Sequence, residues 1–145
     1  MLILNPWLVK FGTVTLENVV AVTIDRSAER EVLEWGDEGP FATFADVPEQ
    51  RVAAIVKQAL TREETQSPRP GDTATLVIFT APTAGDTGRQ KLSAQGIVVA
   101  ATIELRSTAS GAAPGMTAIR TLKFALVSSN GAADPVTVSD AGAEV

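Results

Sequence analysis

NVVAVTIDRSAEREVLEWGDEGPFATFADVPEQRVAAIVKQAL, residues 18–60, begins as an apolar segment, becomes charged, reverses at residues 36–40 and returns as a second apolar segment. Side chains alternate between the two faces of a strand, so Val20, Val22 and Ile24 share one face. Glycine and proline in GDEGP are typical of a chain reversal. We therefore predict a long β-hairpin whose base belongs to a sheet and whose outer part, about residues 27–46, projects as an arm.

The expected arm mixes carboxylates with large apolar side chains. A two-stranded hairpin alone is marginally stable in water, so such an arm needs a partner surface and suggests self-assembly. The alternative is that Trp35 and the two nearby phenylalanines fold back onto their own domain. The residues we predict to make contacts between subunits are Glu31, Leu33, Trp35, Asp37, Glu38 and Phe41.

The return segment, Arg51–Leu60, fits two structures. Its apolar residues recur at the spacing of an amphipathic helix, with Asp46 and Pro48 suited to the start of that helix. As a strand, the same segment places Val52, Val56 and other residues on one face. The pattern alone favours the helix, whereas the hairpin requires the strand.

The rest of the chain is predicted to form further strands. Residues 11–16 alternate and reverse at Glu17-Asn18 into the next strand, residues 74–81 are apolar on both faces, and Asn130-Gly131 is a turn signal. Residues 82–92 are the best candidate for a short helix. The remaining predicted strands are 96–106, 117–128 and 136–138, before a C-terminal tail at about 140–145 that we expect to fray.

Composition narrows the possible functions. A chain of 145 residues with 45% hydrophobic and 20% charged residues is expected to form one globular domain. It contains no cysteine, histidine or tyrosine, which removes disulfides, thiolate metal sites and histidine-based catalysis. The net charge of -5 argues against a phosphate-gripping surface. We expect no membrane span and no export signal.

Few motifs suggest chemistry. Asp86-Thr87-Gly88 is the triplet of aspartic proteases, but it follows a loop rather than an apolar strand, so a turn or the start of a helix is the favoured interpretation. Glu63-Glu64 and Asp37-Glu38 lack the spacing of a calcium loop and are interpreted as solvated charge. We therefore predict no catalytic, cofactor-binding or metal-binding residues and no enzymatic activity.

The order of these segments resembles that of the tail tube proteins of long-tailed bacteriophages, which are related to the tube of type VI secretion. The resemblance covers nearly the whole chain. It rests on the order of the segments and on short stretches of sequence, and not on a catalytic motif. In that family the return segment is typically a strand, which favours the strand for Arg51–Leu60. The phrases that carry it are VAVTIDRS (20–27), WGDEGP (35–40), DVPEQRV (46–52), PRPGDTATLVIFTAPTAGD (68–86) and LVSSNGAADPVTVSDA (126–141).

The resemblance implies a mainly β fold, an antiparallel β-sandwich or small barrel with one short α-helix and a long projecting hairpin arm. It implies hexameric rings that stack into a tube and a virion location, with assembly in the host cytoplasm. Its partners would be further copies of itself, then sheath, baseplate and tail terminator proteins. DNA would pass through the lumen without specific binding, and an acidic lumen would repel its phosphates. Another virion ring component, such as a baseplate, terminator or head decoration protein, is the alternative.

Overall fold

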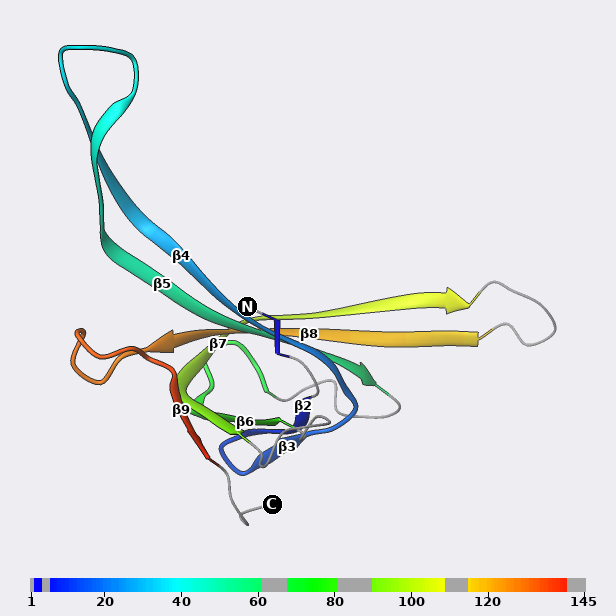
Figure 1. Ribbon diagram of the computed structural model, residues 1–145. Coiled ribbons are helices and arrows are strands. Elements are labelled where there is room, and N and C mark those ends of the chain that lie inside the picture. The colour runs from blue at the N-terminus through cyan, green and yellow to red at the C-terminus, as the bar shows by residue number, and fades with distance from the viewer. Residues whose placement is uncertain (1, 4–5, 61–67, 81–89, 109–114, 141–145) are drawn as a thin grey trace, which may run out of the picture.

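The computed structural model describes residues 2–3, 6–60, 68–80, 90–108 and 115–140 (Figure 1). Within these residues the chain is mainly β-strand and contains no helix. The strands are β1 (Leu2–Ile3), β2 (Pro6–Phe11), β3 (Val14–Leu16), β4 (Val19–Trp35), β5 (Ala42–Leu60), β6 (Thr73–Thr80), β7 (Gln90–Thr108), β8 (Gly115–Val127) and β9 (Thr137–Asp140).

All nine strands belong to one antiparallel sheet. Their order across the sheet is β1-β4-β5-β8-β7-β6-β2-β3, and β9 pairs with β7 beside that path. The sheet is not closed into a barrel. The prediction of a mainly β, antiparallel fold is therefore confirmed, whereas the closed form of the small barrel does not occur.

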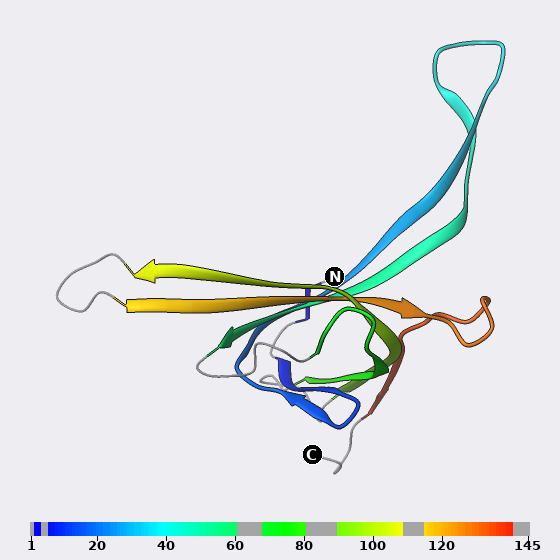
Figure 2. The same cartoon turned by 180° about the vertical axis from the view of Figure 1, so that it is seen from behind.

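The sheet folds over because β7 is shared between two layers. Residues 91–97 of β7 pair with β6, and residues 95–108 pair with β8. The register of β7 on β8 shifts between Val98 and Ala100, which marks a bulge, and bulges bend strands. Figures 1 and 2 show β2, β3 and β6 lying on one side of the layer made by β4, β5 and β8.

The core lies between these two layers. The rings of Phe11 on β2 and Phe124 on β8 are 4.9 Å apart between centroids. Alternate residues of each strand point into this space, as expected for strands with one covered face. The buried cluster comprises Val9, Phe11, Leu16, Val22, Ile24, Val52, Ala54, Val56, Leu76, Ile78, Leu92, Ala94, Val98, Leu122, Phe124 and Leu126.

One buried polar group interrupts the apolar core. Arg120 is 1% exposed, and its Nε and Nη2 atoms donate to Oε1 of Gln58 at 3.0 and 2.7 Å. Nε2 of Gln58 donates in turn to the carbonyl oxygen of Glu17 at 2.9 Å. Buried polar groups need such partners, and this chain of bonds links β8, β5 and the turn before β4.

Arg51–Leu60 is part of strand β5, so the helical spacing was misleading there. β5 is a central strand that pairs with β4 on one side and β8 on the other. Val52, Ala54 and Val56 enter the core, while Ala53 and Ile55 on the other face are also apolar. A strand with apolar residues on both faces contains the spacing of a helix by coincidence.

Two details of the N-terminal strands differ from the prediction. Residues 11–16 do not form one strand, because Gly12 adopts a left-handed conformation (φ 64°) and turns the chain from β2 into β3. The reversal at Asn18, also left-handed (φ 54°), lies where it was expected. Val20 is 59% exposed instead of sharing the buried face with Val22, because the register of β4 on β5 shifts between Val19 and Ala21.

The short helix predicted for residues 82–92 is not confirmed. Residues 82–89 lie outside the described residues, and the remaining three residues belong to β7. In the described part of the chain, no helix is long and apolar enough to cross a membrane.

Candidate interaction surface on the β4–β5 hairpin

Burial stops abruptly along the paired strands β4 and β5. Ile24 on β4 and Val52 on β5 are the buried residues nearest to the hairpin turn, and their exposed fractions are 2% and 6%. Between them, from Asp25 to Arg51, every residue is exposed except the half-buried Val32. We call residues 25–51 the outer hairpin, and Figures 1 and 2 show it extending away from both layers of the sheet.

The outer hairpin is held by its own backbone pairing. The pairing runs from Arg26↔Val52 to Trp35↔Ala42, with register shifts between Ala28 and Arg30, between Arg30 and Val32 and between Glu34 and Trp35. Such shifts add twist to a hairpin. No other described strand pairs with it, so both of its edges carry backbone groups available to a partner.

Ion pairs support the lower half of the outer hairpin. Nε of Arg30 lies 3.2 Å from Oε1 of Glu49 across the two strands. Arg51 pairs with Glu29 in the same way. These pairs satisfy the charges near the base, and because they are exposed each adds about 0.2–1 kcal/mol at most.

The end of the hairpin has a defined shape. Nε1 of Trp35 donates to the carbonyl oxygen of Pro40 at 3.2 Å across the turn. Oγ1 of Thr43 donates to the carbonyl oxygen of Glu34 at 3.4 Å. A Cβ atom on Gly36 would lie 3.3 Å from Cγ2 of Thr43, so the turn approaches β5 closely at this glycine. These contacts order the loop that presents the large side chains.

Large apolar side chains are exposed at this end. Trp35 is 59% exposed and Phe41 is 82% exposed. Leu33 shares a face of β4 with Trp35, whereas Phe44 lies opposite Glu34 on the other face. The turn of the hairpin cannot cover apolar side chains on both faces of its two strands. A cluster of exposed apolar side chains is typical of an interaction site.

The six residues predicted to contact another subunit all lie in the outer hairpin: Glu31, Leu33, Trp35, Asp37, Glu38 and Phe41 are all exposed. The alternative in which Trp35 and both phenylalanines pack on their own domain does not occur. The prediction omitted Phe44 and Val47, which are 50% and 40% exposed. The sequence could have indicated them, because both are large apolar residues on the return strand of the predicted hairpin.

Charge is concentrated at the same end. Residues 31–46, which we call the tip, hold five carboxylates and no lysine or arginine. The remainder of the chain holds twelve acidic and twelve basic residues. The tip therefore carries the whole formal net charge of -5 in addition to its exposed aromatic rings.

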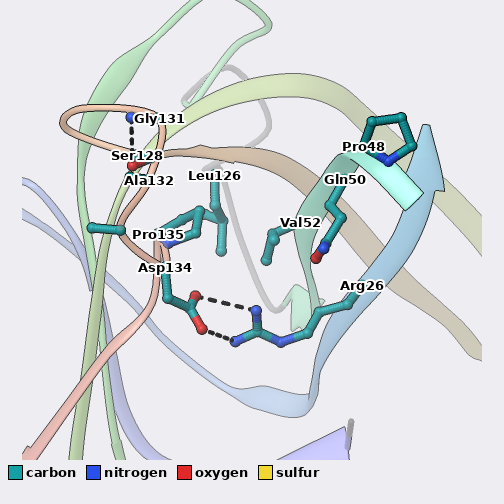
Figure 3. Close-up of a pocket in the computed structure, with 11 residues that line it drawn as sticks. Arg26, Pro48, Gln50, Val52, Leu126, Ser128, Gly131, Ala132, Asp134 and Pro135 are labelled. Atoms are coloured by element: carbon teal, nitrogen blue, oxygen red, sulfur yellow. Dashed lines mark hydrogen bonds and ion pairs between the residues drawn. The ribbon is translucent and has the colours of Figure 1, made fainter. Parts of the chain in front are cut away.

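A groove lies where the outer hairpin meets the sheet (Figure 3). Its volume is about 470 Å³, and Arg26, Gln50 and Val52 line it from the hairpin side. From the other side, the segment between β8 and β9 contributes Asp134 and Pro135. Figure 3 shows Arg26 and Asp134 facing each other across this groove.

Asp134 is held by two kinds of contact. Its Oδ1 accepts a hydrogen bond from Nη1 of Arg26 at 3.1 Å, and its Oδ2 forms an ion pair with Nη2 of the same arginine at 3.0 Å. Oδ1 also accepts the backbone N–H of Val136 at 3.0 Å. The Val136 hydrogen bond, and next the Arg26 guanidinium, lower the pKa of the Asp134 carboxyl below its ordinary value. The sequence analysis did not predict this pair.

The segment that presents Asp134 is itself ordered by local bonds. Oδ1 of Asn130 accepts the N–H groups of Ala132 and Ala133 at 2.9 and 2.8 Å, and Oγ of Ser128 accepts that of Gly131 at 3.0 Å. Gly131 has a positive φ of 82°, as the predicted Asn-Gly turn requires. The turn thereby places Asp134 beneath the outer hairpin.

The other motifs add no chemistry to this surface. Among the residues that the structure describes, no group of three acidic side chains is arranged to hold a metal ion. Asp86-Thr87-Gly88 and Glu63-Glu64 lie outside the described residues. Asp37 and Glu38 are exposed side by side in the hairpin turn. The surface is suited to binding a partner of complementary charge and apolar character.

No protein-family model matches the chain, and no curated protein matches it significantly.

Proposed function

We propose that this chain is a structural subunit of a phage tail tube. Copies assemble into hexameric rings, the rings stack, and the lumen conducts DNA during ejection. The number of subunits in a ring and the passage of DNA are taken from the resemblance of the sequence to tail tube proteins. The stacking contact is supported by the outer hairpin.

The observation that carries the proposal is a hairpin that ends in exposed apolar side chains. Trp35 and Phe41 are 59% and 82% exposed at a tip whose backbone is nevertheless ordered. Burying large aromatic side chains stabilises a contact by roughly 1.5–3 kcal/mol each. An arm that extends from one subunit and inserts into the next ring uses these groups.

The edges of the described sheet support lateral contacts within a ring. On the side opposite β8, no described strand pairs with β7 beyond Val98, so Val99–Thr108 lies at an edge of the described sheet. At the other end of the sheet, β1 covers only Val22 and Thr23 of β4. Two different edges brought together by rotation make a heterologous contact that closes into a ring.

Further partners follow from a place in the virion tail. Sheath, baseplate and tail terminator proteins would meet the outside and the ends of such a tube. DNA in the lumen would pass without specific binding. Outside the tip the acidic and basic residues are equal in number, so the subunit body has no excess of positive charge with which to hold phosphates.

The test removes the end of the outer hairpin. Replacing residues 34–41 with an Asn-Gly turn should leave a folded protein, as judged by circular dichroism and thermal unfolding. It should prevent tubes from appearing in negative-stain electron micrographs. A matched control is Val138→Ser, which changes an exposed apolar residue on β9, and should leave tubes intact. Tubes of normal length from the shortened protein would contradict the role of the arm.

The same images separate the rival functions. Baseplate, terminator or head decoration proteins would give closed rings or bound oligomers that never stack, because only a head-to-tail contact propagates. An aspartic protease would show peptide cleavage that Asp86→Asn abolishes. Wild-type protein that cleaves no peptide would remove that rival.

A further inference from the structure

A second groove lies on the outer face of the β2–β6–β7 layer. It has a volume of about 540 Å³ and is lined by Lys10, Gly12, Thr75, Val77, Phe79 and Lys91. Val77 alternates along β6 with the core residues Leu76 and Ile78, so it points away from the core. The half-buried Val77 therefore gives the floor of this groove an apolar side chain, whereas Phe79 beside it is only 5% exposed.

Two lysines flank that floor. Lys10 on β2 is the direct neighbour of Val77, and Lys91 on β7 is the direct neighbour of Phe79. Lys10 is exposed and Lys91 is half-buried. The groove thus offers an apolar surface between two cationic side chains, which is complementary to an apolar group surrounded by carboxylates.

The tip has that complementary character. Trp35 and Phe41 are exposed beside Asp37 and Glu38, and residues 31–46 contain no basic side chain. Figures 1 and 2 place the tip and the β2–β6 layer on opposite sides of the β4–β5–β8 layer. The tip of a molecule therefore points away from its own groove, and the contact must join two copies.

We propose that the tip of one copy binds in the Lys10–Lys91 groove of a second copy, with an aromatic ring on Val77 and carboxylates beside the two lysines. The proposal rests on the proposed function and names the receiving surface of the stacking contact. Because donor and acceptor lie at opposite sides of each subunit, the contact is heterologous and repeats without limit.

Two other surfaces fit the tip less well. Lys57 and Lys123 are exposed on the outward face of β5 and β8, but that face belongs to the layer from which the outer hairpin itself extends. The groove at the base of the hairpin is lined by one cationic side chain, Arg26, instead of two. Of these three surfaces, the Lys10–Lys91 groove is the one that combines two lysines with an apolar side chain on the side away from the outer hairpin.

The first experiment uses the absence of cysteine from the native sequence. Phe41→Cys protein is mixed with Lys10→Cys protein under mild oxidation, and disulfide-linked heterodimers are measured by mass. Lys57→Cys, also on an exposed lysine, is the matched control. The proposal expects faster crosslinking to Lys10→Cys than to Lys57→Cys. Equal rates, or faster crosslinking to Lys57→Cys, would overturn it.

The second experiment reverses charges. Lys10→Glu with Lys91→Glu, and separately Asp37→Lys with Glu38→Lys, should each abolish tubes, while all four changes in one chain should restore them. Lys57→Glu with Lys123→Glu is the control and should assemble. If the groove variant forms normal tubes, the groove is wrong and the tube function stands. If wild type forms only closed rings, the tube function fails, and the crosslinking rates decide the groove independently.

Discussion

Arg26 and Asp134 are 108 residues apart in the chain, yet their side chains form two contacts of 3.1 and 3.0 Å at the base of the outer hairpin. One partner lies on β4 where burial ends, and the other lies in the segment that leads from β8 to β9. The pair ties the emerging hairpin to the body of the domain and thereby constrains its direction.

Removing this tie is expected to weaken assembly more than folding. Asp134→Ala should lower the free energy of unfolding by about 1 kcal/mol or less, because both side chains are about half exposed. It should reduce the yield of tubes, since the hairpin samples more directions. Glu49→Ala removes an ion pair within the outer hairpin and should change tube yield less. Urea unfolding and micrograph counts measure the two effects.

The same carboxylate predicts a pH dependence. Its pKa in the folded protein lies below the ordinary value of 3.8, chiefly through the N–H of Val136 and then through Arg26. A lowered pKa stabilises the fold at pH values above the ordinary one, and that stabilisation is lost as the pH falls through the folded value. The difference in unfolding free energy between wild type and Asp134→Asn should therefore shrink below about pH 4. A difference that grew with acidity would contradict this assignment.

Trp35 should matter for association and hardly at all for folding. Its side chain is largely exposed, so Trp35→Phe should change the unfolding free energy by less than about 0.5 kcal/mol. On assembly, the fluorescence of Trp35 should move to shorter wavelength as water leaves the indole. Subtracting the spectrum of Trp35→Phe removes the contribution of the other tryptophan. No shift in assembled wild-type protein would place Trp35 outside the contact.

Gln58 should be important for folding. Gln58→Ala removes the acceptor of two bonds from the buried Arg120 and leaves the carbonyl of Glu17 without its donor. We expect a loss of about 1–3 kcal/mol in unfolding free energy. The control is Gln95→Ala, an exposed glutamine that donates to Thr75 at 2.7 Å, with a loss below about 0.5 kcal/mol. Urea midpoints compare the two variants.

The strands were largely predictable because apolar alternation reports which side chains face a core. Residues 74–81 and 117–128 matched β6 and β8 within a few residues. β5 was ambiguous because a central strand is apolar on both faces, and the helical spacing then arises without a helix. Gly12 was missed because a single glycine in an alternating segment does not reveal that it adopts a positive φ.

The candidate interaction surface was likewise predictable from the sequence only in part. The sequence of residues 31–46 indicated exposed aromatic side chains, because they stand among carboxylates that a buried core could not accommodate. Arg26 with Asp134 was not predictable, because the pairing depends on how the sheet folds over and not on local sequence. The groove around Val77 was equally hidden, since it needs β2, β6 and β7 to lie side by side.

The uneven distribution of charge gives the subunit a direction. Two tips that approach each other bring together like charges on residues 31–46 and repel within the screening distance of about 10 Å in ordinary salt. The aromatic rings are thus kept from forming a symmetric pair, although such a pair would bury them. A filament of these subunits has two chemically different ends, one acidic and one not, and growth at the two ends should proceed at different rates.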